Sequence, residues 1–240
     1  MVQPEPMFVR AQPMLNVVRL VTVPSAGEVF LCEGGDDALW FVKKTPNSGA
    51  LADWIGLSLV RALGGPVPDV AVARFAAPDR CGLDGRIATR EVADYTHWMP
   101  GRWDSIENAQ ELAVVALVDA LLDVDDRHSR NLLLQPLAAH SFRVLAIDFD
   151  NAALMSPDRL TDTFRAPAEN PWPIDGVRKD TLLTAMASLV EHPGLEHVRD
   201  IVTAGGHHWP HVQLEEIADA LEERCERAAD LVAAFIDRWN

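Results

Sequence analysis

Three polar residues in the middle of the chain have the types and the spacing that metal-assisted phosphoryl transfer requires. Asp126 and Asn131 lie five residues apart, and the apolar run Leu132-Leu133-Leu134 follows them. Asp148 comes directly after the apolar segment 142–147. A carboxylate can orient an attacking hydroxyl and take its proton, while an amide and a second carboxylate can hold Mg²⁺ against nucleotide phosphates. The order of these residues supplies each of these parts.

Two apolar segments must position this group. Segment 104–122 has apolar side chains at helical spacing on nearly all of its faces, which predicts a buried helix capped by Asp104 or Ser105. Segment 142–147 is typical of a strand. Asp126 and Asn131 are therefore expected in a loop after a buried helix, and Asp148 at the end of a strand.

The rest of the chain divides into a strand-rich part and a helical part. Strands are expected at 17–23, 28–32, 38–43, 70–75 and 86–92, with one helix at 51–63. Segment 95–103 has the Pro and Gly residues of a connection, and the amphipathic stretch 214–239 closes the chain. The expected fold class is α+β, with an N-terminal lobe (1–95), a helical C-terminal lobe (96–240) and a ligand site between them.

Composition excludes several classes of protein. The 240 residues are 48% hydrophobic, but no apolar stretch of about 18 residues lacks a charge, so no membrane span is expected. The formal net charge of −15 argues against a nucleic-acid partner, which needs clustered Lys and Arg. No secretory signal is visible, and three distant cysteines make no disulfide framework, so we expect a cytoplasmic protein.

Two stretches resemble motifs of known kinases. The string Asp126-Arg127-His128-x-x-Asn131, with the later Ile147-Asp148-Phe149, resembles the catalytic and metal-binding loops of phosphoinositide kinases and HipA-like kinases. It also resembles those of aminoglycoside and choline-type phosphotransferases. The run Trp40-Phe41-Val42-Lys43, followed by a helix and by segment 63–72, is similar to the lysine strand, helix and turn of small bacterial HipA-family proteins. The matches span about residues 38–152.

The resemblance implies a two-lobed, protein-kinase-like fold and an ATP- and Mg²⁺-dependent kinase, HipA-like, that phosphorylates a hydroxyl acceptor. Asp126 would be the catalytic carboxylate. His128 would be a second candidate for proton transfer or for steadying the γ-phosphate. Asn131 and Asp148 would hold the metal. The acceptor, a protein or a small molecule, stays open.

The resemblance also implies a nucleotide site in the N-terminal lobe. Lys43 would reach the α- and β-phosphates; Lys44 is one residue away, and strand alternation places only one of the two in the cleft. Asp53 is the nearest acid on the following helix that could orient Lys43, although related kinases generally use a longer Glu. The backbone of Glu91-Val92-Ala93 would bind adenine. The expected phosphate-covering loop, Ser25-Ala26-Gly27, has a single glycine.

Each of these residues also has a purely structural interpretation. Asp126 could cap a helix, Asn131 could be a turn residue, Asp148 could end a strand and Lys43 could be a solvated lysine. Their conjunction in the expected order favours the catalytic interpretation. Two other functions stay open: an aminoglycoside-type small-molecule phosphotransferase, whose cationic substrate would suit the acidic surface, and a nucleotide-binding pseudokinase that acts as an interaction module.

Two further segments lie towards the C-terminus. Residues 156–175 hold four prolines, so they are expected to form an irregular loop that contacts the acceptor. His207 and His211 have the spacing of helical metal ligands, but Pro210 lies between them and would interrupt the helix. No metal site is expected there.

Overall fold

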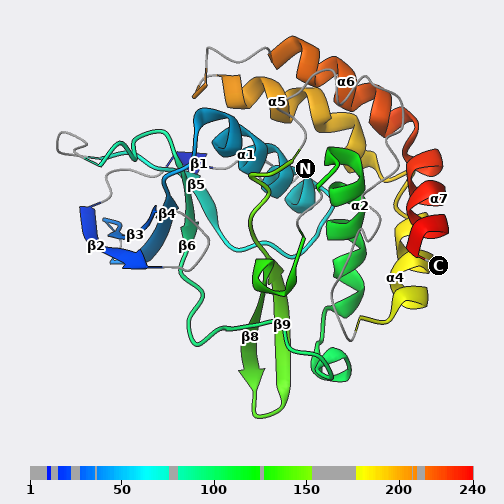
Figure 1. The fold of residues 1–240 in the computed structure, drawn as a ribbon, viewed down its shortest axis with the longest axis horizontal. Coiled ribbons are helices and arrows are strands. Elements are labelled where there is room, and N and C mark those ends of the chain that lie inside the picture. Colours follow the sequence, from blue (N-terminus) through cyan, green and yellow to red (C-terminus); the bar gives the residue numbers. More distant parts are fainter. Residues whose placement is uncertain are drawn as a thin grey trace, which may run out of the picture.

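The computed structural model describes residues 10–11, 16–22, 28–35, 37–75, 81–124, 127–152, 177–206, 208–209 and 214–239. They form a strand-rich N-terminal lobe and a helical C-terminal lobe (Figure 1). The expected fold class, α+β with two lobes, is confirmed. None of the helices in these ranges is long and apolar enough to cross a membrane.

The N-terminal lobe is built on a six-stranded sheet of order β1-β5-β6-β4-β3-β2. Its strands are β1 (Arg10–Ala11), β2 (Asn16–Thr22), β3 (Glu28–Glu33), β4 (Leu39–Lys43), β5 (Val70–Val72) and β6 (Ile87–Arg90). β4 pairs antiparallel with β3 and β6, so it lies inside the sheet. Alternation along β4 buries Trp40 and Val42 and leaves Lys43 half-buried on the other face. The sheet thus presents Lys43 at the end of an internal strand.

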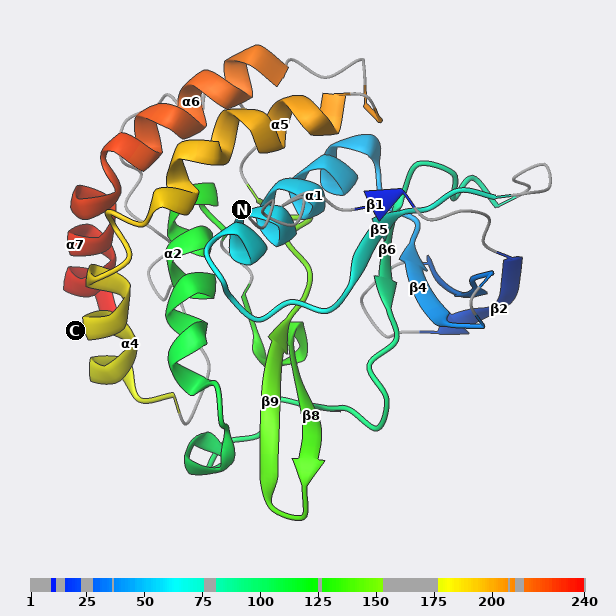
Figure 2. The ribbon, with the colours of Figure 1, turned by 180° about the vertical axis from the view of Figure 1, so that it is seen from behind.

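Helix α1 (Asn47–Ala62) follows β4 after a short connection and joins the two lobes. It packs on α2 (Leu112–Leu122) and on α5 (Val198–Gly206), and both views of the fold place it between the sheet and these helices (Figure 1 and Figure 2). Trp54 Nε1 donates a hydrogen bond to the Ile201 carbonyl at 2.9 Å. A Cβ on Gly205 would lie 2.9 Å from Leu51, so α5 approaches α1 closely there. These contacts hold α1 against the C-terminal lobe.

The C-terminal lobe surrounds α2, all of whose residues are buried. Around it, the described part of this lobe has the α-helices α4 (Lys179–Ala187), α5, α6 (Leu214–Glu226) and α7 (Ala228–Trp239). A second sheet has the order β7-β8-β9, with β7 (Thr96–His97), β8 (Leu132–Ala138) and β9 (Ser141–Ala146). β8 and β9 form a hairpin that projects away from the helices (Figure 1).

The start of the buried helix differs from the prediction. Sequence periodicity predicts a helix from Asp104 or Ser105, whereas α2 begins at Leu112 after two 3₁₀ turns. The reason lies in a contact with β9. The Asn108 side chain accepts a hydrogen bond from the Val144 amide at 2.8 Å and donates one to the Val144 carbonyl at 3.0 Å. This contact binds segment 106–108 to the strand instead of letting it continue the helix.

Candidate active site

Lys43 and the segment after β9 meet at the junction of the two lobes. Lys43 Nζ donates hydrogen bonds to both carboxylate oxygens of Asp148, at 3.0 and 3.1 Å, and lies 2.6 Å from Asp150 Oδ2. Lys44 turns to the opposite side and pairs with Glu28 at 2.9 Å, where both side chains are exposed. Of the two neighbouring lysines, Lys43 is therefore the one that faces Asp148.

The charges of this group are unbalanced, because one ammonium faces two carboxylates. Burial opposes the charge of Lys43, but Asp148 and Asp150 raise the pKa of the ammonium above its ordinary value. Burial would also raise the pKa of Asp148, yet Lys43 lowers it below the ordinary range. Burial and the neighbouring Asp148 raise the pKa of Asp150 to about 6. The excess of negative charge suits a further cation.

The backbone at Asp148 has a conformation that few residues adopt. Its φ of 67° lies in the left-handed region, which costs an ordinary residue about 1–2 kcal/mol and is tolerated better by Asp and Asn. The next amide, Phe149 N, donates a hydrogen bond to Asp53 Oδ1 at 2.6 Å. Asp53 is buried on α1, so the helix holds the turn that directs the Asp148 carboxylate toward Lys43.

Asp53 therefore has a different contact from the one predicted. None of the ion pairs of the described residues joins it to Lys43, and its charge acts on Lys43 only at longer range. The physical reason is its short side chain, one oxygen of which accepts the hydrogen bond of the Phe149 amide inside the protein. Burial, followed by the charges of Asp148 and Asp150, raises the pKa of Asp53 well above its ordinary value.

Asn131 lies beside this group because two backbone segments pair. Ile147 N donates a hydrogen bond to the Asn131 carbonyl at 2.9 Å, which puts Asn131 next to the residue that precedes Asp148. Asn131 is buried at the end of a 3₁₀ turn, 129–131. Carboxylate and amide oxygens are the ligand types that Mg²⁺ prefers. The described residues contain no cluster of three or more His, Cys, Asp or Glu that could hold a metal by itself, so a cation here would need further oxygens, such as those of a phosphate.

Arg127 is a residue of this site that the sequence interpretation missed. Its guanidinium is fully buried and donates two hydrogen bonds to the Asp119 carboxylate, at 2.8 and 2.9 Å. A third reaches the Ile147 carbonyl at 2.7 Å, and the cation lies 4.3 Å from the centre of the Phe149 ring. Arg127 thus ties α2 to both neighbours of Asp148. The lone acid Asp119 in an apolar helix was the available signal, because a buried carboxylate requires a partner.

Phe149 is held from the other side by α1. Its ring is fully buried, and a Cβ added to Gly56 would lie 2.3 Å from the ring. The absence of a side chain at Gly56 is what allows the helix to approach this closely. Phe149 is thereby enclosed between α1 and Arg127. This packing also restrains the backbone of Asp148, the residue directly before it.

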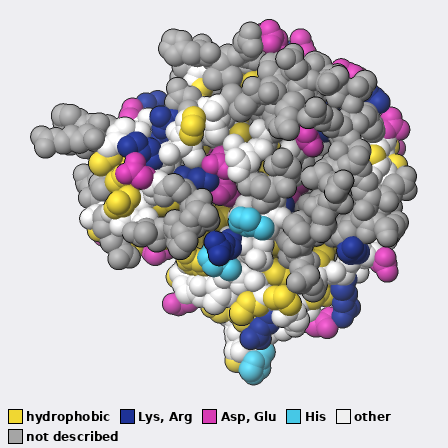
Figure 3. All heavy atoms as spheres, viewed as in Figure 1, with side chains coloured by type: hydrophobic (Ala, Val, Ile, Leu, Met, Phe, Trp, Pro, Cys, Tyr) yellow, Lys and Arg dark blue, Asp and Glu magenta, His cyan; other side chains and the backbone are white. Residues whose placement is uncertain are grey.

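The remaining residues of the predicted site are partly described. His128 is exposed, and its carbonyl accepts a hydrogen bond from the Asn131 amide at 2.9 Å. Asp126 lies outside the described residues, as do Ser25-Ala26-Gly27, the loop 156–175, and both His207 and His211. On the face of the molecule that Figure 3 shows, basic, acidic and histidine side chains lie close together near the middle.

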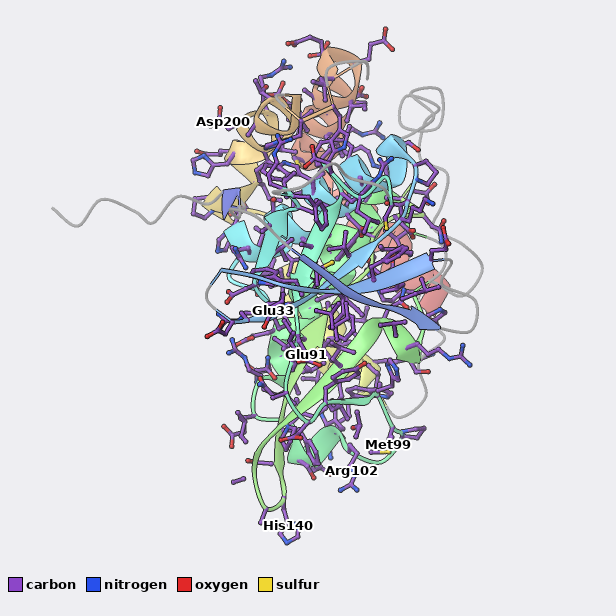
Figure 4. All side chains as sticks on the ribbon, turned by 90° about the vertical axis from the view of Figure 1, so that its left-hand side faces the viewer. Glu33, Glu91, Met99, Arg102, His140 and Asp200 are labelled. Atoms are coloured by element: carbon purple, nitrogen blue, oxygen red, sulfur yellow. The ribbon has the colours of Figure 1, made fainter. Side chains whose placement is uncertain are left out.

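The predicted adenine-binding segment follows β6. Glu91 N donates a hydrogen bond to the Leu39 carbonyl, and Glu91 lies between the first sheet and the β8–β9 hairpin (Figure 4). Val92 is buried, whereas the side chains of Glu91 and Ala93 are exposed. Val92 packs in a small apolar cluster that is separate from the main core. The other members of this cluster are Leu133, Leu145 and Ile147.

A solved kinase structure is similar to this chain over nearly its whole length. The chain is similar to the Helicobacter pylori proinflammatory kinase CtkA, with a TM-score of 0.56 and 12% identity over 94% of this chain and 95% of that one. This chain has a two-lobed, kinase-like fold. At such identity the similarity establishes the kinase-like fold and leaves the activity to be argued from the residues.

Two further structures resemble the chain more weakly. One is HipA of Shewanella oneidensis MR-1 in its complex with HipB and operator DNA, with a TM-score of 0.44 and 13% identity over 98% of this chain and 70% of that one. The other is WaaP in complex with acyl carrier protein, with a TM-score of 0.40 and 19% identity over 86% and 89% of the two chains. No protein-family model matches the sequence, and neither does any curated protein sequence.

Proposed function

We propose that this protein is an ATP- and Mg²⁺-dependent kinase, HipA-like, that transfers the γ-phosphate of ATP to a hydroxyl acceptor. The observation that carries the proposal is the contact of Lys43 with Asp148, beside Asn131, where the lobes of a kinase-like fold meet. These residue types come from separate segments, and kinases use the same combination to position phosphates and metal.

The nucleotide would lie between the lobes. Lys43 would contact the α- and β-phosphates, since its half-buried ammonium is already held at the junction. The backbone of residues 91–93 would bind the adenine edge. Val92, Leu133 on β8 and Leu145 on β9 form a buried apolar cluster next to this segment, which would support the site from below.

Asn131 and Asp148 would hold the magnesium ion, and the excess of carboxylate charge around Lys43 favours a divalent cation there. When bound, Mg²⁺ neutralises phosphate charge as the transition state develops. The chain's own contribution is rigidity. Arg127 and Asp53 hold the backbone on the two sides of Asp148, so its carboxylate needs little reorganisation.

Asp126 would orient the acceptor hydroxyl and take its proton. The hydroxyl oxygen forms a bond to the γ-phosphorus, the bond from the γ-phosphorus to the β-phosphate oxygen breaks, and ADP leaves. His128 is exposed two residues away and is the second candidate for the proton. The acceptor, a protein or a small molecule, is to be found by experiment.

The decisive experiment is mass spectrometry of the protein after incubation with ATP and Mg²⁺, with and without candidate acceptors. We expect phosphate transfer by the wild type and none by Asp148→Asn, which removes a ligand charge and little volume. Turnover with an aminoglycoside alone would favour the small-molecule phosphotransferase. Nucleotide binding without phosphate transfer to any acceptor would contradict the proposal and favour the pseudokinase.

A further inference from the structure

Lys43 has two acidic partners, and the closer of them was not among the predicted site residues. Asp150 Oδ2 lies 2.6 Å from Lys43 Nζ, whereas the nearer Asp148 oxygen lies at 3.0 Å. The Asp150 side chain is also the more buried of the two acids, with 15% of its surface exposed against 27% for Asp148. Asp150 is therefore a well-enclosed partner of the lysine.

The position of Asp150 is set by the first turn of α1. A Cβ added to Gly49 would lie 3.2 Å from the Asp150 Cβ and 3.4 Å from its carbonyl oxygen. The helix that begins at Asn47 thus packs directly on Asp150, and glycine at this position leaves the room for it. A short connection joins Lys43 to α1, so the helix on which Asp150 packs begins close to the lysine in the chain.

Neither of the other two acids near Lys43, Asp53 and Asp148, is free to hold the ammonium in place alone. Asp53, the acid on the helix, accepts its hydrogen bond from the Phe149 amide and makes no ion pair with Lys43 among the described contacts. Asp148 would also serve the metal ion, and a dication at its oxygens would repel the Lys43 ammonium. Asp150 is the one acid in contact with Lys43 that the proposed metal ligands do not include.

From this geometry we propose that Asp150 is the positioning residue for Lys43: it holds the ammonium toward the phosphates while Asp148 serves the metal. The acid that orients the lysine would then come from the segment after β9 rather than from helix α1. This inference rests on the proposed kinase function, since it assigns Asp150 a part in the same reaction.

A double-mutant cycle tests the inference. Asp150→Asn and Lys43→Met are each expected to lower kcat/KM for ATP by about tenfold or more, the effect of losing one hydrogen bond to a charged group. The double variant should be no worse than Lys43→Met alone, because Asp150 would act only through Lys43. The Mg²⁺ concentration for half-maximal rate should stay within about twofold of the wild type in Asp150→Asn.

The same cycle on the protein without nucleotide gives a readout besides activity. The two substitutions should be non-additive in chemical unfolding, because the pair is in contact in the free protein. The matched control is the exposed pair of Lys44 and Glu28 on the neighbouring strands. Glu28→Gln with Lys44→Met removes an exposed pair of a lysine and an acid and should leave kcat/KM for ATP within about twofold.

The outcomes separate the two proposals. Additive losses in kcat/KM, or a large rise in the Mg²⁺ requirement of Asp150→Asn, would overturn the positioning part of Asp150. The second result would place its action on the metal, directly or through the neighbouring Asp148. The kinase function would survive either result. A wild-type protein that neither binds nor turns over ATP would overturn the kinase function and this inference with it.

Discussion

Replacing Arg127 with methionine should destabilise the folded chain, because it leaves the Asp119 carboxylate buried without this cation. Arg127 donates two hydrogen bonds to Asp119 and one to the Ile147 carbonyl, and both side chains of the ion pair are excluded from water. Removing one partner of a buried pair costs about 3–5 kcal/mol. For a domain whose free energy of unfolding is about 5–15 kcal/mol, this is a large part of the total.

The matched change is Asp119→Leu, alone and together with Arg127→Met. Asp119→Leu alone should cost a similar amount, because the buried guanidinium loses the carboxylate that balances its charge. The double variant replaces the pair with apolar side chains of similar size, which is often neutral for stability. It keeps one defect, since the Ile147 carbonyl has lost its donor, at a cost of about 1 kcal/mol. We therefore expect the double variant to lose about 1 kcal/mol and the single variants several times more.

In the double variant, the rate of phosphate transfer should not recover together with the free energy of unfolding. The double variant still lacks the contact of Arg127 with the Ile147 carbonyl and with the Phe149 ring, the two neighbours of Asp148. Phosphate transfer by the double variant should therefore stay about tenfold or more below the wild type even where the protein is fully folded.

The measurements are urea unfolding, followed by the fluorescence of the seven tryptophans, and steady-state turnover well below the transition. Single variants within about 0.5 kcal/mol of the wild type would refute the energetic argument. A double variant as unstable as the sum of the single variants would refute the pairing. If the double variant regains full turnover along with its stability, the ion pair contributes to stability alone and not to phosphate transfer.

Three further predictions concern single residues of the site. Asp126→Asn should lower kcat by about 10²-fold with little change in ATP affinity, since the group acts on the proton in the transition state; an unchanged kcat would remove it from the mechanism. Gly56→Ala should destabilise the protein by about 1–3 kcal/mol in urea unfolding by overpacking the Phe149 ring, whereas Gly35→Ala, where a Cβ meets nothing within 4 Å, serves as the control. Asp53→Asn keeps the acceptor for the Phe149 amide and removes a buried charge whose folded-state pKa is raised, so the variant should be more stable than the wild type at pH 8. That advantage should shrink toward pH 4, where the raised pKa leaves Asp53 protonated in the folded wild type; an advantage that grows on acidification would contradict the assignment.

Several features of this protein could be read from the sequence because they are local. Alternation along β4 separates Lys43 from Lys44, and the structure places only Lys43 against Asp148. The alternating pattern of the first ninety residues predicts a strand-rich part, and most of its strands are found in the six-stranded sheet. These features depend on the two-residue alternation of side chains along a strand, which a few neighbouring residues are sufficient to specify.

Other features depend on packing between distant segments. Asp53 and Phe149 are 96 residues apart in the chain, and Lys43 and Asp148 are 105 apart. The distance between α1 and the segment after β9 decides which acid contacts Lys43 and which accepts a hydrogen bond from a backbone amide. Glycines at 49 and 56 set that distance. Periodicity shows which face of a helix is buried, but not the depth at which a neighbouring chain lies against it. For that reason the order of the polar residues could be read from the sequence, whereas the contacts of Asp53, Arg127 and Asp150 were decided by the tertiary structure alone.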